Sequence, residues 1–369
     1  MIKKIISFFL NAILHLFPID DKKIVFTGTK YQAVDNPYYV YKYFKSQKTD
    51  YKLIFILARD ADVSGLDKND YVYVRTLKSF YHLATYKYLF TCQSFGSIVK
   101  KRPGQMYIQF WHGIAFKKMG LDMQNPNNLL QDPHTADWEW FVTSSEYDRD
   151  SVKSAYGYTC PAKILGTPRT DPLFAGYDND SIKKRLNITD NKKIVLYAPT
   201  FRDEELSHKT VKLHLPLDSM DDFTVLIRLH PEISKKIDAK IFENRPNLIN
   251  VCEYPNLNEL LSVSDILITD YSSIFFDFSL FNKLTVFYAY DLDEYINTRK
   301  GFYLDYKKDL PGPIAYTEND LKNIFDNIGK NIEDYKTAIR EFNKRFNYMN
   351  DGKVCARIFD ELLNGGFEK

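Results

Sequence analysis

The feature that most constrains this chain is the regular alternation of short apolar runs with stretches of helical character. The apolar runs are rich in β-branched and aromatic residues, which favours buried strands. Buried strands that alternate with helices predict parallel sheets with helices on both faces. The predicted strands are residues 23–27, 51–58, 71–74, 88–91, 106–111, 141–144 and 163–165, then 193–198, 224–229, 248–251, 265–269 and 284–288; the predicted helices include 37–48, 146–156, 257–263 and 273–281.

The strands fall into two series that part near residues 178–184. A chain of 369 residues is too long for one ordinary core, whereas two domains of roughly 150 to 200 residues suit it. We therefore predict an α/β chain with two doubly wound, Rossmann-like domains that face each other across a cleft. Residues 21–178 form the first domain and residues 179–369 the second, with the last helix free to pack back on the first domain. Ligands of such folds bind at the carboxyl ends of strands.

Composition excludes several classes of protein. Hydrophobic residues make up 44% of the chain and charged residues 27%, which is typical of a folded protein. The net charge of +2 argues against a general nucleic-acid binder, because such proteins carry a marked basic excess. The four cysteines include no CxxC pair, which favours free thiols in a reducing compartment over a zinc site or a disulfide framework.

Residues 1–20 form a separate segment, with an apolar run at residues 5–17. As a helix this run reaches about 20 Å, short of the ~30 Å hydrocarbon core, so we predict no membrane span. Its polar residues recur every four positions on one stripe: Lys3, Ser7, Asn11 and His15. The pattern predicts that residues 3–17 are an amphipathic helix in a membrane interface, with lysines at anionic headgroups. A helix packed on the protein's own core or on a second subunit is the alternative.

A histidine follows one of the predicted strands of the first domain. His112 and Gly113 come directly after strand 106–111, and a basic turn, Lys117-Lys118, follows. A histidine at a strand end, beside a glycine that lets the backbone approach closely, has the chemistry and position of a general base. A histidine that only caps the strand is the alternative.

Polar side chains follow the strands of the second domain at one predicted edge. They are Thr200, Arg202, Arg228, His230, Asp270, Ser272 and Ser273, and Arg169 comes in the turn at the domain junction. Cations at strand ends and the free N–H groups of a helix start favour an anion, so we predict a cradle for a diphosphate-bearing ligand. In the alternatives, Arg202 pairs with Asp203 or a neighbouring acid, the two serines only cap a helix, and Arg169 belongs to a plain turn.

Several common enzyme motifs are missing from the sequence. It has no GxxxxGK[ST], GxGxxG, HExxH or GxSxG, which disfavours a P-loop enzyme, a dinucleotide dehydrogenase, a zincin and an α/β-hydrolase.

Seven ordered motifs between residues 105 and 315 carry a family resemblance. They are residues 109–113 (QFWHG) with 117–120 (KKMG), 166–169 (GTPR), 197–203 (YAPTFRD), 228–231 (RLHP), 269–273 (TDYSS), 287–291 (FYAYD), and 301–306 (GFYLDY) with 310–313 (LPGP). This pattern resembles the CDP-glycerol glycerophosphotransferases of wall teichoic acid and capsule synthesis.

The resemblance implies a GT-B fold, with the acceptor in the N-terminal domain and CDP-glycerol in the C-terminal domain. It also implies peripheral attachment to the cytoplasmic face of a bacterial membrane and no metal cofactor. The two histidines thought essential in the family match His112 and His230. Lys117 and Lys118 would then lie on the acceptor side. Thr167 and Phe201 depart from the tyrosine and tryptophan that the family often has, beside the reactive positions.

The reaction expected from this resemblance is attack of an acceptor hydroxyl on the β-phosphorus of CDP-glycerol, with release of CMP. His112 would take the proton, and His230, Arg228 and the helix start at Ser272-Ser273 would hold the diphosphate. The alternatives are a CDP-ribitol donor, a two-domain nucleotide-sugar epimerase, or a scaffold without turnover. The acceptor is read as a lipid-linked saccharide, and the short chain leans toward a primase over a polymerase. The sequence leaves the oligomeric state open.

Overall fold

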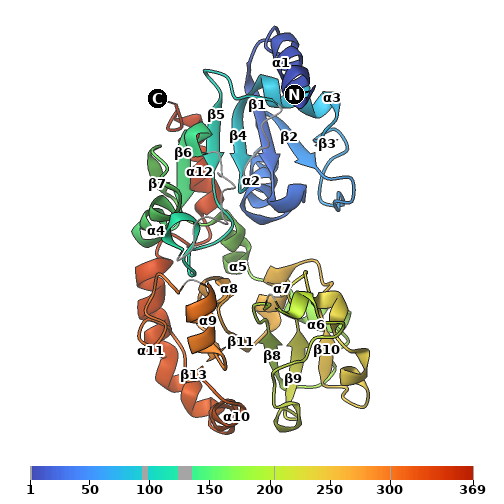
Figure 1. The fold of residues 1–369 in the computed structure, drawn as a ribbon, viewed down its shortest axis with the longest axis vertical. Coiled ribbons are helices and arrows are strands. Elements are labelled where there is room, and N and C mark those ends of the chain that lie inside the picture. Colours follow the sequence, from blue (N-terminus) through green and yellow to red (C-terminus); the bar gives the residue numbers. More distant parts are fainter. Residues whose placement is uncertain (1, 94–98, 124–134, 203, 300, 369) are drawn as a thin grey trace. The chain divides into compact units, whose positions relative to one another are not determined.

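The computed structural model describes residues 2–93, 99–123, 135–202, 204–299 and 301–368. They form two compact units, each around one parallel sheet (Figure 1). The first unit takes its residues from segments 1–113, 125–171 and 349–369, and the second takes them from segments 114–124 and 172–348. The chain is therefore an α/β protein with two parallel sheets, as the alternation of strands and helices predicted.

The sheet of the first unit has seven strands in the order β3-β2-β1-β4-β5-β6-β7. Every neighbouring pair is parallel. The strands are β1 (Asp20–Thr27), β2 (Lys52–Leu57), β3 (Tyr71–Tyr73), β4 (Tyr86–Thr91), β5 (Met106–Gln109), β6 (Trp140–Thr143) and β7 (Ala162–Ile164), and the helices are α1 (Ile2–Leu14), α2 (Asp35–Ser46), α3 (Leu77–Thr85), α4 (Glu146–Tyr156) and α12 (Val354–Leu363). The strand order reverses between β1 and β4, so the doubly wound topology has its switch point there.

The sheet of the second unit has six parallel strands in the order β10-β9-β8-β11-β12-β13. The strands are β8 (Lys193–Tyr197), β9 (Phe223–Ile227), β10 (Leu248–Asn250), β11 (Ile266–Thr269), β12 (Leu284–Tyr288) and β13 (Ile314–Ala315), and the helices are α5 (Asp171–Ala175), α6 (Asn179–Arg185), α7 (Leu257–Val263), α8 (Ile274–Ser279), α9 (Leu292–Arg299), α10 (Glu318–Asp326) and α11 (Ile328–Phe346). Its switch point lies between β8 and β11, so both units repeat one topology.

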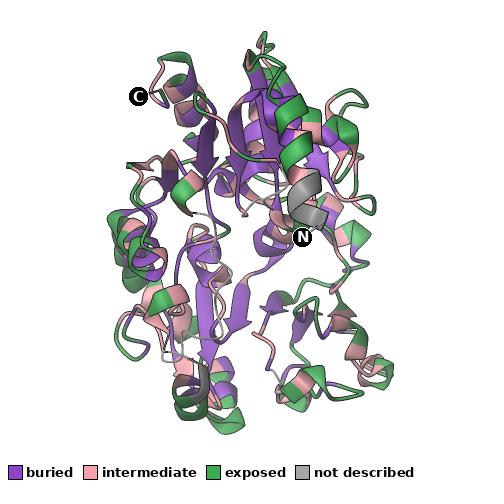
Figure 2. Ribbon diagram, turned by 45° about the horizontal axis from the view of Figure 1, so that its top comes forward, coloured by how far each residue is buried: buried purple, intermediate pink, exposed green. Residues whose placement is uncertain are grey.

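Each sheet carries its own hydrophobic core, and the central strands of both sheets are largely buried (Figure 2). Phe26 of β1 lies at the centre of the first core, with the rings of Phe44 and Phe90 edge-on at 6.3 and 5.6 Å. The core of the second unit gathers β-branched and leucine side chains from β8, β9, β11 and β12. These apolar runs were read from the sequence because a strand buried on both faces shows no polar alternation.

Two segments belong to a unit other than the one that sequence order gives them. Residues 114–124 join the second unit, where Phe116 is 2% exposed and packs on Phe275 and Phe302. Residues 349–369 join the first unit, where Ile358 of α12 is fully buried, and Figure 1 shows α12 in red among the blue and green elements of that unit. The units also part between residues 171 and 172, whereas the sequence placed the boundary after residue 178.

The turn after β7 contacts the start of α12 within the first unit. Gly166 has a φ of +109°, and a Cβ there would lie 2.5 Å from the Val354 side chain and 2.7 Å from the Met349 carbonyl. The Asp171 carboxylate accepts the backbone N–H groups of Val354 and Cys355 at 3.0 and 2.7 Å. The turn therefore fixes α12 by close approach and by capping its first turn.

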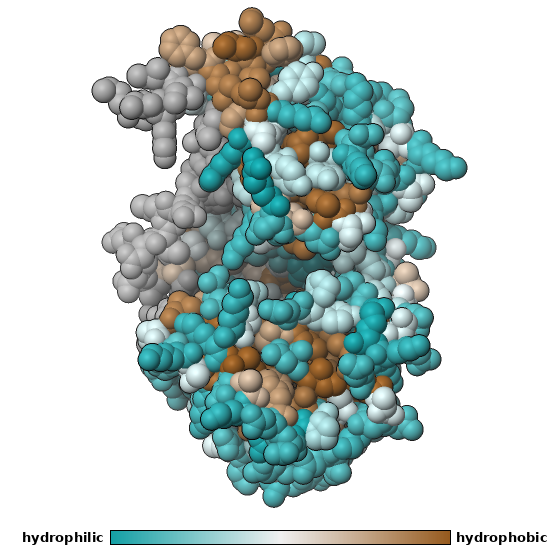
Figure 3. All heavy atoms as spheres, turned by 90° about the vertical axis from the view of Figure 1, so that its right-hand side faces the viewer, coloured by the Kyte–Doolittle hydropathy of each residue, from teal (hydrophilic) through white to brown (hydrophobic). Residues whose placement is uncertain are grey.

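Helix α1 presents its apolar side to solvent. Asn11 is 7% exposed and accepts the Lys100 N–H at 2.9 Å, so this residue of the polar stripe faces its own unit, whereas His15 is exposed. The exposed apolar residues are Phe8, Phe9, Ile13, Leu16 and Phe17, and hydrophobic side chains gather where Figure 1 places α1 (Figure 3). The structure does not describe the side chains of Lys3 and Lys4, which were predicted to meet headgroups. Among the described residues, no helix is both long and apolar enough to cross a membrane. All four cysteines are free thiols.

Candidate active site

The predicted functional residues gather at the switch points of the two sheets. In the first unit, His112 lies beyond the carboxyl end of β5, which pairs with β4, and its Nδ1 lies 3.4 Å from the carbonyl of Cys92 just after β4. In the second unit, Thr200 follows β8 and Asp270 follows β11. Strands that diverge at a switch point leave a crevice outside their carboxyl ends, which is where doubly wound sheets bind ligands.

The backbone around His112 has an uncommon conformation. Trp111, which precedes it, has a φ of +54°, and Gly113, which follows it, has a φ of +151°. A positive φ is a genuine outlier for a bulky residue such as tryptophan, and such outliers cluster at functional sites. The His112 ring stacks on the Trp111 ring with the centroids 4.6 Å apart.

The His112 ring is exposed to solvent, and its Nδ1 lies 3.4 Å from the Cys92 carbonyl oxygen. A carbonyl only accepts, so this weak contact favours the tautomer with hydrogen on Nδ1 and leaves the lone pair on Nε2. Desolvation by the surrounding chain is the main cause that lowers the pKa of His112 below 6.5; the Arg169 charge lowers it further, and the Asp35 charge opposes both. A neutral imidazole with its lone pair on Nε2 is suited to accept a proton near neutral pH.

The structure gives contacts for two further predicted groups. Arg169 Nη1 donates to the His112 carbonyl at 2.7 Å and to Asp35 Oδ1 at 3.1 Å. It therefore contacts the His112 backbone, and its predicted contact with the donor stays a prediction. Lys117 and Lys118 belong to the second unit, where Lys118 N–H donates to the Gly301 carbonyl at 3.1 Å.

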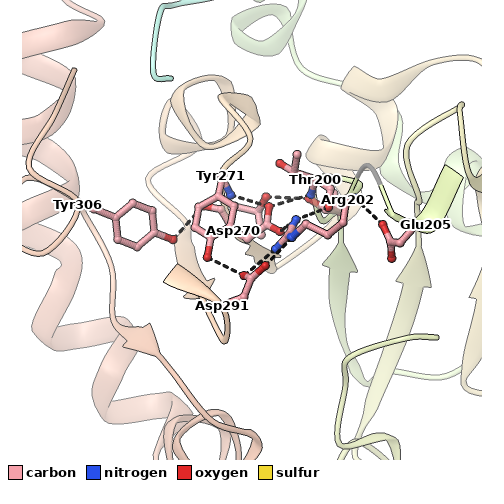
Figure 4. A network of polar contacts seen from close by, with 9 residues as sticks. Thr200, Arg202, Glu205, Asp270, Tyr271, Asp291 and Tyr306 are labelled. Carbon is pink, nitrogen blue, oxygen red and sulfur yellow. Dashed lines mark hydrogen bonds and ion pairs between the residues drawn. The ribbon is translucent and has the colours of Figure 1, made fainter. Parts of the chain in front are cut away.

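Arg202 lies at the centre of a polar network in the second unit (Figure 4). Its Nε and Nη2 donate to the two oxygens of Asp291 at 2.6 and 2.9 Å. Its Nη1 donates to Asp270 at 3.0 Å and to the Thr200 carbonyl at 2.6 Å. Four of the five guanidinium N–H donors are thus used. This is the ion-pair alternative that the sequence left open, with Asp270 and Asp291 as the partners; Asp203 lies outside the described residues.

Aromatic rings surround the same guanidinium. Its Cζ lies 4.9 Å from the Tyr271 ring centroid, 5.4 Å from that of Tyr290 and 5.3 Å from that of Tyr295. Burial alone would raise the pKa of Asp291, but the hydrogen bonds and charge of Arg202 outweigh it and lower that pKa. The network links the residues that follow the carboxyl ends of β8, β11 and β12, so it holds these strand ends together at the switch point.

Thr200 and Asp270 make further hydrogen bonds in the same network. The Asp270 carboxylate accepts the Thr200 N–H at 2.7 Å and the Tyr271 N–H at 2.5 Å, and its carbonyl accepts the Tyr306 hydroxyl at 2.9 Å. The Thr200 Oγ1 is buried and has no hydrogen-bond partner among the described residues. A buried polar atom left unpaired costs free energy and commonly marks a place where a ligand or water bonds.

The remaining predicted groups surround the switch point. Arg228 is half-buried, and its Nη1 donates to the Val251 and Tyr254 carbonyls at 3.0 and 2.8 Å. His230 is exposed, and its ring centroid lies 4.6 Å from that of Phe201. The sequence predicted serine caps for the helix now seen as α8. The Ser272 Oγ accepts the Ile274 N–H at 3.3 Å, whereas the adjoining Ser273, at the N-cap position, makes no side-chain cap bond.

The sequence reading missed Asp35, Asn36, Asp291 and Tyr306 as site residues. Asp291 and Tyr306 lie inside quoted motifs, so their positions were visible, although no local pattern assigned them a partner. Asp35 and Asn36 open α2 and carried no motif. Within the described residues, no group of three or more His, Cys, Asp or Glu side chains is placed to hold a metal ion. The prediction that transfer needs no metal stays a prediction.

Residues 8–364 match the family described as CDP-Glycerol:Poly(glycerophosphate) glycerophosphotransferase. The chain belongs to this family. The Staphylococcus aureus (strain NCTC 8325 / PS 47) teichoic acid glycerol-phosphate transferase is 31% identical to it, over 92% of this chain and 91% of that relative. The Bacillus spizizenii teichoic acid poly(glycerol phosphate) polymerase is 30% identical, over 95% of this chain and 94% of the relative. The wall teichoic acid polymerase TagF, in a variant with CDPG, superposes with a TM-score of 0.86 at 27% identity, over 98% of this chain and 93% of that one.

These findings identify the enzyme as a CDP-glycerol glycerophosphotransferase of the teichoic acid type, as the ordered motifs predicted. Relatives named as ribitol-phosphate polymerases match at 28 to 29% identity. The UDP-GlcNAc 2-epimerase of Neisseria meningitidis shares the fold alone, with a TM-score of 0.53 at 13% identity. The epimerase alternative therefore has only a common architecture in its favour.

Proposed function

We propose that this transferase moves glycerol phosphate from CDP-glycerol to a hydroxyl of a membrane-linked saccharide or glycerol-phosphate acceptor, in teichoic acid or capsule synthesis. The observation that carries the proposal is the exposed His112, whose Nδ1 faces the Cys92 carbonyl at 3.4 Å and whose pKa is lowered below 6.5 by desolvation, which favours a neutral ring with its lone pair on Nε2. A group of this kind is what an acceptor hydroxyl needs in order to attack phosphorus near neutral pH.

In the proposed reaction, the acceptor oxygen forms a bond to the β-phosphorus of CDP-glycerol. The bond from that phosphorus to the bridging oxygen breaks, and CMP leaves with the electron pair. The hydroxyl proton passes to His112 Nε2 and later to solvent. Phosphoryl transfer depends mainly on positioning and on stabilising charge, so the donor side needs hydrogen-bond donors that stay in place.

We assign the donor to the switch point of the second unit. The Thr200 hydroxyl is buried there without a partner among the described residues, and a diphosphate oxygen would satisfy it. His230 follows β9, and Ser272 and Ser273 follow β11; these two strands flank β8, and we propose that the three residues contact the same diphosphate. We assign Arg202 and Asp270 a supporting role at this site, since their charged atoms already bond to each other.

We further propose that α1 attaches the enzyme to the cytoplasmic face of the bacterial membrane. Phe8, Phe9 and Leu16 are 70%, 62% and 82% exposed, while Asn11 and Leu14 hold the helix on its own unit. A helix fixed in this way offers its apolar side to a lipid surface. The acceptor would then be presented at the same surface; a homo-oligomer that covers α1 stays the alternative.

The experiment measures CMP release from CDP-glycerol and from CDP-ribitol, with and without a lipid-linked disaccharide analogue. Acceptor-dependent release from CDP-glycerol that is lost in His112→Ala and His230→Ala supports the proposal. Release from CDP-ribitol alone would contradict the glycerol donor. Release that continues in His112→Ala would contradict the assigned base. Absence of turnover with either donor, together with binding of CDP-glycerol, would favour a scaffold.

Thr200→Val tests the donor site separately. Valine has nearly the shape of threonine, and the hydroxyl that the substitution removes has no partner among the described residues, so no hydrogen bond among those residues is lost. We expect a KM for CDP-glycerol about 10-fold higher than wild type, because a hydrogen bond to a charged group contributes roughly 1.5–3 kcal/mol. An unchanged KM would remove Thr200 from the donor site.

A further inference from the structure

The peptide groups on either side of His112 are held by side chains from other parts of the first unit. The Trp111 N–H donates to Gln109 Oε1 at 3.0 Å, and the Trp111 carbonyl accepts Asn36 Nδ2 at 3.0 Å. The His112 carbonyl accepts Arg169 Nη1 at 2.7 Å. Asn36 is 1% exposed and Gln109 is fully buried, so both side chains make these hydrogen bonds in the interior of the unit.

The groups that hold the backbone are themselves fixed to one another. Asn36 Oδ1 accepts the Arg169 N–H at 3.2 Å, and Arg169 Nη1 lies 3.1 Å from Asp35 Oδ1. Asp35 has a φ of +65°, and its Oδ2 accepts the Thr29 hydroxyl at 3.0 Å. The start of α2 and the turn around Arg169 therefore form one linked support beneath His112.

This support stabilises the backbone conformation of Trp111, which would be unfavourable without it. The left-handed φ of Trp111 is unfavourable for a side chain with a Cβ, and it persists only when surrounding bonds determine it. Loss of either carbonyl bond frees the peptide to rotate, and the attached imidazole turns with it. A displacement of the base of about 1 Å is enough to slow an in-line transfer strongly.

We infer that Asn36 and Arg169 are positioning residues, which aim the His112 ring by fixing the carbonyls of Trp111 and His112. The inference rests on the proposed function of His112 as the base. It gives Arg169 a role on the first unit's own backbone, distinct from a contact with the donor. Asn36 and Arg169 then affect the rate of transfer, while the affinity for CDP-glycerol stays with the second unit.

The test compares Asn36→Ala and Arg169→Ala with wild type in steady-state CMP release from CDP-glycerol, using the acceptor analogue above. We expect kcat to fall about 10- to 100-fold in each variant, with the KM for CDP-glycerol within twofold of wild type. Arg169→Lys keeps the positive charge beside Asp35 but has a shorter side chain without the planar guanidinium, so we expect its kcat to lie between those of wild type and Arg169→Ala.

Asn247→Ala is the matched control for burial and lost hydrogen bonds. Asn247 is 8% exposed in the second unit, and its Nδ2 donates to the Met220 and Phe223 carbonyls at 3.2 Å each. A structural cost alone would lower the thermal midpoint in Asn247→Ala and Asn36→Ala alike, with kcat per folded molecule unchanged in both. We expect the loss of kcat only in Asn36→Ala.

The outcomes separate this inference from the function on which it rests. Full kcat in folded Asn36→Ala and Arg169→Ala, with His112→Ala inactive, would overturn the positioning role and leave the base in place. A raised KM for CDP-glycerol in Arg169→Ala would return Arg169 to the donor site and overturn its assignment here. Continued turnover in His112→Ala would overturn the proposed base, and the inference with it. Should Asn36→Ala not fold, the two Arg169 variants decide.

Discussion

Arg202 and Asp291 form a bidentate ion pair, with Nε to Oδ2 at 2.6 Å and Nη2 to Oδ1 at 2.9 Å, although 89 residues separate them in sequence. The pair is largely buried, with side-chain exposures of 10% and 15%. Asp270 adds a second carboxylate from the end of β11, with its Oδ2 3.0 Å from Arg202 Nη1. Charged hydrogen bonds of Arg202 thus hold together the strand ends at the switch point of the second sheet.

Arg202→Met tests the structural weight of this pair. We expect the free energy of unfolding to fall by about 3–5 kcal/mol, because removing one partner leaves buried carboxylates uncompensated. Denaturant unfolding followed by circular dichroism measures it. Arg245→Met is the control, since its partner Asp218 is 92% exposed and such surface pairs contribute at most about 1 kcal/mol. Equal losses in the two variants would contradict the role assigned to Arg202.

His82 predicts an acid-sensitive stability. It is 9% exposed, both ring nitrogens lack a partner among the described residues, and burial, with the charges of Lys23 and Lys78, lowers its pKa to about 4. The unfolded chain therefore binds more protons between pH 6.5 and 4. The associated stability is fully present above pH 6.5 and is lost as pH falls through that window, by about 3 kcal/mol in all.

His82→Phe removes this titrating group while keeping an apolar ring. We expect its unfolding free energy to decline less than that of wild type between pH 6.5 and 4, with the curves nearly parallel above pH 7. Urea titrations at several pH values provide the comparison. Identical pH profiles for the two proteins would show that His82 does not control the acid response.

Alanine substitutions at two glycines with positive φ distinguish the stability cost of backbone strain from that of steric overlap. A Cβ at Gly157, with φ +61°, meets nothing within 4 Å, whereas one at Gly166 meets Val354 and Met349 atoms of the segment that leads into α12. Gly157→Ala should cost about 1–2 kcal/mol from its left-handed backbone alone. Gly166→Ala should cost roughly 2 kcal/mol more, because the start of α12 must shift. Equal thermal midpoints would mean that α12 does not press on this turn.

The pH dependence of kcat/KM tests the electrostatics of His112. The base must be neutral to act, and its pKa is lowered from 6.5, so activity should fall only below pH 6.5 on the acid side. The Asp35 charge raises that pKa, so Asp35→Asn should move the acid limb to still lower pH. An acid limb centred above 6.5 in wild type would contradict the surroundings described for the ring.

The exposed side of α1 predicts lipid binding that depends on its apolar residues. Phe9→Ser with Leu16→Ser should weaken binding to vesicles of anionic phospholipid at least about tenfold, since a fully buried Phe or Leu contributes roughly 1.5–3 kcal/mol. Co-sedimentation measures the bound fraction. Leu363→Ser is the control, because Leu363 is 56% exposed on α12, away from α1. Unchanged binding in the double variant would point to a protein partner for α1.

The sequence alone determined the local structure and the edge of the sheet at which each chemical group lies. Helices α4 and α7 and strand β12 have the predicted bounds, and β3 and β8 differ from prediction by one residue at one end. Strand β13, with two residues, was missed because so short a run carries no pattern of its own. These features depend on neighbouring residues, whose spacing is fixed by the chain itself.

Only the tertiary structure decided which groups meet. Asn36 bonds to the Trp111 carbonyl across 75 residues, and Arg202 pairs with two aspartates that no local pattern distinguished from other acids. Residues 114–124 join the second unit against sequence order, and residues 349–369 join the first unit, a placement that the sequence left open for the last helix. A strand or helix follows from the preferences of adjacent residues, whereas the partner of a buried charge or strained carbonyl follows from packing that brings distant strand ends together. The motifs thus placed His112 and Arg202 at strand ends, and the fold gave each of them its partners.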